Sequence, residues 1–168
     1  QVLYQTNAML PPGRFTAKVV VRENATGQMG TFEASIAVPD LSKDAVKLSA
    51  LVVGTQLRPN PSTRSQNPLI RDGVELVPNV THVMRRNQPL YVYYEVYDPA
   101  VDAGAPDIRT NLTFFKGETK VFETPMVERT ALDATDRRAA LLQFEVAPGS
   151  LAAGLYTCQV GVIDAVSG

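Results

Sequence analysis

The sequence predicts an all-β protein whose antiparallel strands pack as a sandwich. Short stretches that alternate apolar and polar residues recur along the 168-residue chain, and they are rich in β-branched and aromatic residues. Twelve Pro and eleven Gly residues are scattered between these stretches, which is typical of many turns that join short strands. Helical periodicity is nearly absent, so the crossover helices that a parallel sheet requires are not predicted.

The first two alternating stretches predict a β-hairpin. Residues 15–23 read FTAKVVVRE and residues 31–38 read TFEASIAV, so each stretch carries its apolar residues on one face. Between them, Asn-Ala-Thr-Gly at residues 24–27 is typical of a turn. Residues 39–42, Pro-Asp-Leu-Ser, then interrupt the pattern and are interpreted as a linker.

A second series of strands follows the linker. One strand pattern begins near Val46, and further strands are predicted at residues 81–84, 90–97, 111–115, 120–123, 139–146 and 155–163. Loops or turns are predicted at residues 55–68, 71–73, 98–107 and 148–154. Within residues 130–140, Asp133 or Thr135 is a possible cap for a single helical turn, the one helical interpretation that the pattern leaves open.

The segment Gly-Leu-Tyr-Thr-Cys at residues 154–158 makes the predicted sandwich immunoglobulin-like. In the sixth strand of immunoglobulin-like domains, a Tyr two residues before a Cys hydrogen-bonds back across the corner that precedes the strand. Tyr156 and Cys158 have this spacing, and Gly154 stands at the corner. Because the chain has one cysteine, Cys158 is interpreted as a small buried apolar residue and not as half of an internal disulfide.

The end of the chain repeats its beginning at a constant offset, which indicates a repeated structural unit. Phe15 corresponds to Tyr156, and the identical pairs are Leu10/Leu151, Gly13/Gly154, Thr16/Thr157, Val19/Val160, Val21/Val162 and Gly27/Gly168. We therefore predict two domains. Residues 1–42 are the C-terminal hairpin of a preceding immunoglobulin-like repeat plus a linker, and residues 43–168 are an immunoglobulin-like sandwich that lacks its own last strand. The fold expected is thus a sandwich with an additional N-terminal hairpin.

Such a truncated sandwich would expose an unpaired strand edge, and an isolated hairpin is marginally stable in water. Both defects disappear if residues 31–38 pair beside residues 155–163, where the missing strand would lie. The hypothesis is completion of this kind, either within one chain or between two chains as a strand-swapped homodimer. The alternative is that the hairpin packs elsewhere.

Composition argues against several classes of function. The net charge is −1 with acidic and basic residues interspersed, whereas nucleic-acid binding requires a clustered basic face. No apolar run reaches the roughly 20 residues of a membrane-spanning helix. One His and one Cys are too few for a zinc site, so no metal and no cofactor are predicted. Nucleic acid and membrane insertion are therefore not expected among the partners.

Three tyrosines on one face of residues 90–97 are the candidate ligand-binding residues. Tyr91, Tyr93 and Tyr97 alternate with Leu90, Val92, Tyr94 and Val96 on the opposite face. A strand that is apolar on both faces is either covered on both sides or exposes a hydrophobic surface that can bind another molecule. The tyrosines either pack beneath a loop or a neighbouring module, or they recognise a protein or a glycan.

Two further groups of residues are candidates for a chemical site. His82 is expected on the outward face of a strand as a solvated residue, and no strand-turn-helix nucleophile elbow supports a catalytic triad around it. Asp98, Asp102 and Asp107 share one loop, but their spacing fits no calcium motif. No catalytic residue is therefore assigned, and the protein is not expected to be an enzyme. An accessory or catalytic domain of an enzyme remains the alternative from another class.

Residues 10–41 and the run VELVPNVTHVMRRNQPLYVYYEVYDPA at residues 74–100 resemble a known family. They look like the C-terminal β-sandwich region of bacterial von Willebrand factor type A-related proteins of the kind abundant in Acidobacteria. The resemblance implies a secreted, periplasmic or envelope-associated protein in which sandwich modules follow an adhesion-type domain. The Asp-x-Ser-x-Ser metal motif of that domain does not occur here, so no metal site carries over.

The function expected is therefore that of a non-catalytic structural or interaction module, which spaces or presents an adhesion-type domain. Its partners would be a protein or neighbouring domains of the same polypeptide. The alternative is a carbohydrate- or peptide-binding module that uses the aromatic strand face of Tyr91, Tyr93 and Tyr97.

Overall fold

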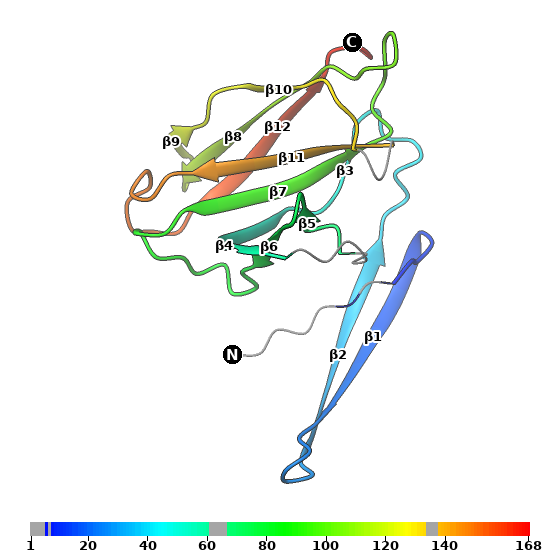
Figure 1. Cartoon of the computed structure of the whole chain (residues 1–168), viewed down its shortest axis with the longest axis vertical. Coiled ribbons are helices and arrows are strands. Elements are labelled where there is room, and N and C mark those ends of the chain that lie inside the picture. Colours follow the sequence, from blue (N-terminus) through cyan, green and yellow to red (C-terminus); the bar gives the residue numbers. More distant parts are fainter. Residues whose placement is uncertain (1–5, 7, 61–66, 134–137) are drawn as a thin grey trace. The chain divides into compact units, whose positions relative to one another are not determined.

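The computed structural model describes residues 6, 8–60, 67–133 and 138–168, and every regular element in these ranges is a β-strand (Figure 1). The prediction of an all-β protein with antiparallel sheets is therefore confirmed. The chain divides into two compact units, Gln1–Asp44 and Ala45–Gly168. Residues 134–137, part of the segment considered for a helical turn, lie outside the described residues, and 130–133 and 138–140 are not helical.

The first unit contains a two-stranded antiparallel hairpin of β1 (Gly13–Arg22) and β2 (Met29–Val38). Phe15 lies opposite Ile36 and Val19 lies opposite Phe32, so one face of the hairpin is apolar. On the other face Lys18 and Glu33 lie opposite each other and form an ion pair of 2.7 Å. The hairpin is amphipathic, as the alternation in its sequence predicts.

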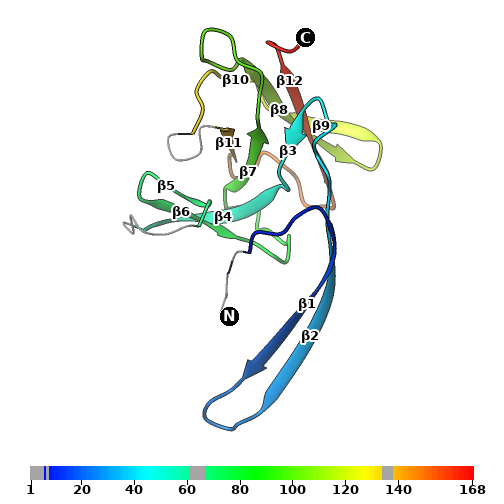
Figure 2. The ribbon, with the colours of Figure 1, turned by 90° about the vertical axis from the view of Figure 1, so that its right-hand side faces the viewer.

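The second unit contains two sheets. The first sheet has the order β11-β7-β4-β6-β5, with β3 also paired to β7, and its strands are β3 (Lys47–Leu48), β4 (Val52–Pro59), β5 (Ile70–Arg71), β6 (Val74–Pro78), β7 (Leu90–Tyr97) and β11 (Ala139–Val146). The second sheet has the order β10-β8-β12, with β9 paired to β8, and its strands are β8 (Ile108–Lys116), β9 (Thr119–Glu123), β10 (Val127–Arg129) and β12 (Thr157–Asp164). In Figures 1 and 2, β7 and β11 lie in one layer, and β8 and β12 lie in the other.

The core lies between these two sheets. It combines alternate residues of β7, β11 and β8, namely Val92, Tyr94, Val96, Ile108, Leu112, Phe114, Ala140, Leu142, Phe144 and Val146. The rings of Tyr94 and Phe144 stack with their centroids 6.3 Å apart. From β12, Cys158, Val160 and Val162 pack against this core, but each of them is only partly buried. The core is therefore less well covered along β12 than along β8.

The strand predicted at residues 81–84 is wrong. These residues form an irregular segment because the side chain of Asn79 organises a local turn. Its Oδ1 accepts hydrogen bonds from the N–H and the hydroxyl of Thr81, at 3.1 and 2.7 Å, and its Nδ2 donates to the Val83 carbonyl at 2.8 Å. His82 has a φ of 54°, so its expected place on a strand is also wrong, although it is exposed.

The loop predicted at residues 55–68 is wrong at its start, because β4 continues to Pro59. Residues 61–66 of that loop lie outside the described residues. Strand β4 pairs with β6, which the sequence pattern did not predict, and the register shifts between Gly54 and Gln56. A bulge of this kind breaks the alternation from which a strand is recognised.

The pairing expected between residues 31–38 and 155–163, within one chain or between two, stays a prediction. Strand β2 pairs with β1, and β12 pairs with β8. The final strand also begins at Thr157, two residues later than predicted.

Candidate functional site

The three candidate tyrosines of β7 do not form a free aromatic stripe. Tyr93 is 5% exposed and packs with Leu69 and Leu76, while Tyr91 and Tyr97 are half-buried. The Tyr93 hydroxyl donates a hydrogen bond to Glu95, and burial, followed by this hydrogen bond, raises its pKa. Burial and the nearby Glu145 carboxylate raise the pKa of Tyr91 as well. The Tyr93 ring is therefore not available for stacking on a ligand.

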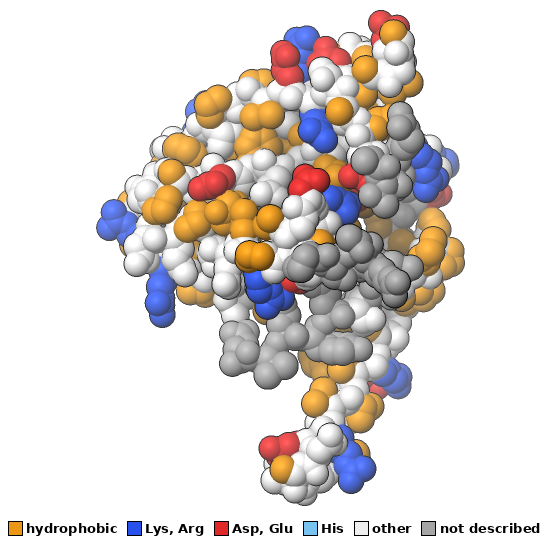
Figure 3. Space-filling view, viewed as in Figure 1, with side chains coloured by type: hydrophobic (Ala, Val, Ile, Leu, Met, Phe, Trp, Pro, Cys, Tyr) orange, Lys and Arg blue, Asp and Glu red, His pale blue; other side chains and the backbone are white. Residues whose placement is uncertain are grey.

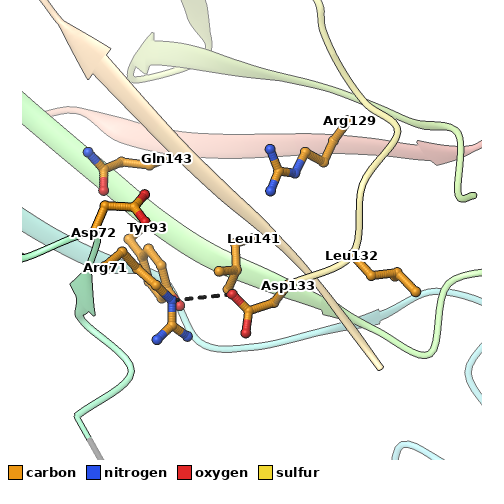
Figure 4. A pocket seen from close by; sticks show the side chains of 8 residues that line it. All are labelled: Arg71, Asp72, Tyr93, Arg129, Leu132, Asp133, Leu141 and Gln143. Atoms are coloured by element: carbon orange, nitrogen blue, oxygen red, sulfur yellow. Dashed lines mark ion pairs between the residues drawn. The ribbon is translucent and has the colours of Figure 1, made fainter. Parts of the chain in front are cut away.

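The outward face over β7 and β11 is mixed in character, with hydrophobic side chains beside acidic and basic ones (Figure 3). A cavity of about 350 Å³ opens next to Tyr93. Its lining comes from β5, β7, β10, β11 and the segments beside them, and consists of Arg71, Asp72, Tyr93, Arg129, Leu132, Asp133, Leu141 and Gln143. Figure 4 shows Arg71 and Asp133 turned toward one another across this cavity.

Arg71 connects the acidic side chains around the cavity. Its guanidinium lies 3.6 Å from Glu95 and 3.7 Å from Asp133, whose side chains are 12% and 7% exposed. The buried Nε atoms of Arg71 and Arg129 have no hydrogen-bond partner within the described ranges. Asp72 and Asp133 balance the two arginines of the lining, and Glu95 adds a carboxylate beside Arg71, so the cavity does not favour an anion. Its described lining includes no nucleophile beside a base, and we assign it no chemistry.

The other candidate groups are separated in the structure. The Asp98 carboxylate pairs with Lys47 at 3.2 Å and the Asp107 carboxylate pairs with Arg109 at 3.0 Å, so these two aspartates are engaged with different cations. Asp102 instead forms a backbone bridge with Ala105. Among the described residues, no group of three or more His, Cys, Asp or Glu side chains is arranged to hold a metal ion.

The corner before β12 has the hydrogen bond expected of the Gly-x-Tyr-x-Cys segment. The Tyr156 hydroxyl donates to the Ala152 carbonyl at 2.8 Å. Cys158 follows on the same strand face and is half-buried against the core, and this burial raises the pKa of its thiol to about 11. The thiol is therefore protonated near neutral pH and packs as an apolar group.

The two segments that the sequence pattern relates, residues 10–27 and 151–168, share some local features. A Cβ built on Gly154 would lie 3.6 Å from the Tyr156 ring, and a Cβ built on Gly13 would lie 3.6 Å from the Phe15 ring. At the other end of the repeat, β1 and β12 each run into a three-residue turn, at 24–26 and at 165–167. Each turn is followed by a glycine with positive φ, 74° at Gly27 and 87° at Gly168. Strands β1 and β12 thus share these two local features.

One edge of β12 has no partner strand among the described residues, because β12 pairs with β8 alone. The N–H of Ala165 donates to the Asp107 carbonyl at 2.9 Å, directly beyond the ladder that pairs Asp164 with Ile108. In an antiparallel ladder every second residue bonds to the neighbouring strand. The backbone groups of odd-numbered residues in β12 therefore face β8, and those of Cys158, Val160 and Val162 face the open edge.

The backbone groups of β1 alternate in the same way as those of β12. The N–H of Glu23 donates to the Gln28 carbonyl at 2.9 Å, directly beyond the pair Arg22–Met29. The backbone groups of Ala17, Val19 and Val21 consequently face β2. At the offset seen in the sequence, these three residues correspond to Cys158, Val160 and Val162. The open edge of β12 therefore presents N–H and C=O groups at the positions that correspond to those through which β1 pairs with β2. We take this edge as the candidate site.

The sequence pattern pointed to the repeat but not to the cavity. Arg71 belongs to a predicted turn, and Arg129 and Asp133 come near it only through long-range folding, for which no local pattern exists. No protein-family model, no curated protein and no solved structure matches the chain. Within the described residues, no helix is long and apolar enough to cross a membrane.

Proposed function

We propose that this chain is a non-catalytic structural and interaction module of the immunoglobulin-like class, from a secreted or envelope-associated bacterial protein. In that protein it spaces or presents an adhesion-type domain. The proposal requires three things of the molecule: an immunoglobulin-like strand arrangement, connection in series with a similar module, and the absence of a catalytic centre.

The pattern of strand pairing carries the proposal. In an immunoglobulin-like sandwich, strands A, B and E share one sheet, and strands C, F and G share the other. In the proposed assignment β4, β7 and β11 are A, B and E, which fits the pairing of β7 with both β4 and β11, and β6 and β5 extend this sheet beyond β4. Strands β8 and β12 correspond to C and F, with β9 in the place of C′. The Tyr156 hydrogen bond at the start of β12 supports this assignment, because the tyrosine corner belongs to strand F.

The amphipathic hairpin supports connection in series. With β12 as strand F, its counterpart β1 is the F strand of another module and β2 is the G strand of that module. The apolar face of the hairpin, formed by Phe15, Ala17, Val19, Val21, Phe32, Ala34, Ile36 and Val38, is then one half of a sandwich core. A series of such modules holds the domains at its two ends at a set distance and orientation from each other.

A spacer module must unfold as one cooperative body when it is pulled. The test is single-molecule stretching of the chain held between two reference domains. We expect one abrupt unfolding step for residues 45–168, which lengthens the chain by about 40 nm. Gradual extension without such a step would contradict a structural role. A reducing buffer is the control, because the single cysteine cannot form an internal disulfide and the step should not change.

A further inference from the structure

We propose that the open edge of β12 pairs with the open edge of β12 from a second copy of this chain. The two strands run antiparallel about a twofold axis, so that the second sheet of one copy continues into the second sheet of the other. The pairing requires only the ladder that joins β12 to β8, and it is independent of the assignment of β12 as strand F.

The open edge of β12 is a regular template for one more strand. The backbone groups of Cys158, Val160 and Val162 face away from β8, which is the one strand paired with β12 among the described residues. All eight residues of β12 pair with β8 in an unbroken register. No bulge therefore turns this edge away from an incoming strand.

The lack of charge on β12 favours a copy of the same strand as the partner. A strand that pairs with itself about a twofold axis brings equal residues close together, and like charges that lie opposite each other are destabilising. Residues 157–163, TCQVGVI, carry no charged side chain. Asp164 is buried, and its carboxylate accepts hydrogen bonds from the N–H groups of Ala100 and Val166 at 2.8 and 3.2 Å. Its charge is thus held by its own chain.

The other outer strands of the second unit are protected in the way that is usual for sheet edges. Charged side chains on an edge strand oppose pairing with another chain. The outer strands β5, β9, β10 and β11 carry Arg71, Lys120, Glu128 and Glu145, respectively. Among these described edges, β12 is therefore the long one that lacks such protection.

The register follows from the backbone groups that are unused. The carbonyl of Asp164 accepts a hydrogen bond from the Ser167 hydroxyl at 3.1 Å, so the unused groups of β12 end at Val162. The antiparallel register that engages all three open residues of both copies places Val160 opposite Val160 and Cys158 opposite Val162 of the second copy. Each such pair exchanges two N–H···O=C bonds, which gives about six bonds in all.

This register also covers apolar side chains. Cys158, Val160 and Val162 pack against the sandwich core but remain partly exposed. In the dimer they lie beside the same three residues of the second copy, so apolar surface leaves water on both sides. On the outward face Ile163, which is 54% exposed, lies opposite Thr157 of the second copy. One strand edge is a small interface, so the dimer should be weak and should depend on concentration.

Disulfide trapping between two single-thiol proteins tests the partner and the register. The unmodified chain, whose one thiol is Cys158, is mixed with the variant Cys158→Ala/Val162→Cys. Every disulfide then joins two chains. Residues opposite each other in a hydrogen-bonded pair have Cα atoms about 5.5 Å apart, which a disulfide spans. In the same ladder position 158 lies about 13 Å or more from position 158 of the second copy, which a disulfide does not span.

The thiol oxidant diamide is added at alkaline pH, and it takes up the two electrons and two protons that the two thiols lose. Intact mass spectrometry distinguishes mixed dimers from dimers of either protein with itself. We expect mixed dimers in large excess over both, and fewer of them on dilution. Random collision would instead give mixed dimers at about twice the level of either like dimer. That ratio overturns the proposal.

The matched control places the thiol on the other face of the same strand. In the Cys158→Ala background, Ile163→Cys replaces Val162→Cys, and the mixture with the unmodified chain is oxidised in the same way. Position 163 is more exposed than position 162, so unspecific collisions should favour it, whereas the proposed register predicts little linkage to Cys158. Mixed dimers as abundant as those of the Val162→Cys variant overturn the register.

A second measurement uses the unmodified chain, so that the proposal does not depend on a variant. Amide hydrogen exchange of β12 is compared between dilute and concentrated solutions. We expect exchange at Cys158, Val160 and Val162 to slow about twofold or more at high concentration, with little change at Gln159, which already bonds to β8. Exchange that is independent of concentration at all four amides overturns the proposal, whereas the cooperative unfolding step expected of a spacer would remain.

Discussion

The hydroxyl of Tyr94 on β7 donates a hydrogen bond to the hydroxyl of Thr110 on β8, and this bond joins the two sheets inside the core. Both side chains are fully buried. The direction of the bond is determined, because Thr110 has one hydroxyl proton and donates it to the Gly161 carbonyl of β12 at 2.6 Å. Burial raises the pKa of Tyr94 to about 12, so the phenol keeps its proton near neutral pH.

These two hydrogen bonds predict that substitutions of Tyr94 and Thr110 lower the free energy of unfolding by unequal amounts. Tyr94→Phe removes one hydrogen bond and should lower the free energy of unfolding by about 1 kcal/mol. Thr110→Val leaves the buried Tyr94 hydroxyl without its acceptor and should cost about 2–3 kcal/mol. The double variant should cost less than the sum of the two, with a coupling of about 1 kcal/mol measured by urea unfolding. Strict additivity would show that the two hydroxyls do not interact.

Gly54 is required by the close approach of β4 and β6. A Cβ at this position would lie 2.5 Å from the Val77 carbonyl oxygen, a backbone atom that cannot move aside without distorting the sheet. Gly54→Ala should therefore lower the free energy of unfolding by about 2–3 kcal/mol. Gly161→Ala is the comparison, because its Cβ would meet only the Asn111 side chain, which can rotate away. Equal costs for the two variants in thermal denaturation would contradict this explanation.

Cys158 should react slowly as long as the protein is folded. Its pKa of about 11, compared with 9.0 for an ordinary thiol, reduces the thiolate fraction near pH 8 by about 100-fold. A chromogenic disulfide reagent should therefore label the native chain at least about 100-fold more slowly than the chain in denaturant, where the pKa is ordinary. Similar rates in both states would show that the thiol is exposed. Free cysteine, measured under both conditions, controls for the effect of the denaturant on the reagent.

Glu75 should make stability depend on acid. The Arg58 guanidinium, which lies 2.7 Å from its carboxylate, and then the Asn60 amide lower the pKa of Glu75 below 4.5. Because the folded state holds this proton less tightly than the unfolded state, the carboxylate stabilises the fold above about pH 4.5. That contribution is lost as the pH falls through the lower, folded-state pKa.

Glu75→Gln should cost about 1–2 kcal/mol at about pH 7 and much less at about pH 3, as measured by urea midpoints. Arg58→Met removes the first partner and should abolish most of the same pH dependence. If the Glu75→Gln difference stays constant across this range, the ion pair does not contribute as described.

The sequence predicted strands well where one face alternates and where turns are local. The hairpin of β1 and β2, strands β7 and β11, and the β8–β9 hairpin follow from this pattern. The pattern failed at Thr81, where an asparagine side chain competes for the backbone, and at Gly54, where a bulge shifts the register. It also gave no indication of the cavity, whose charged residues meet only when β5 and the segment after β10 come together.

Part of the candidate site could be predicted from the sequence, because the relation between its two strands is a sequence pattern. The repeat relates Val19 to Val160 at a fixed offset, and this relation needs no knowledge of which strands are neighbours. Which side of each strand carries the unused backbone groups depends on the ladder, and that required the hydrogen bonds at Glu23 and Ala165. The burial of Tyr93 likewise depends on Leu69 and Leu76, which reach its ring from other strands or turns.

The open edge of β12 also has a consequence for handling the protein. Its N–H and C=O groups at Cys158, Val160 and Val162 are a template for edge-to-edge pairing with another chain. Concentrated solutions should then contain assemblies that are joined at this edge. Ile163 lies on the outward face of β12 beside this edge and is 54% exposed. The substitution Ile163→Lys should oppose edge-to-edge pairing and preserve solubility.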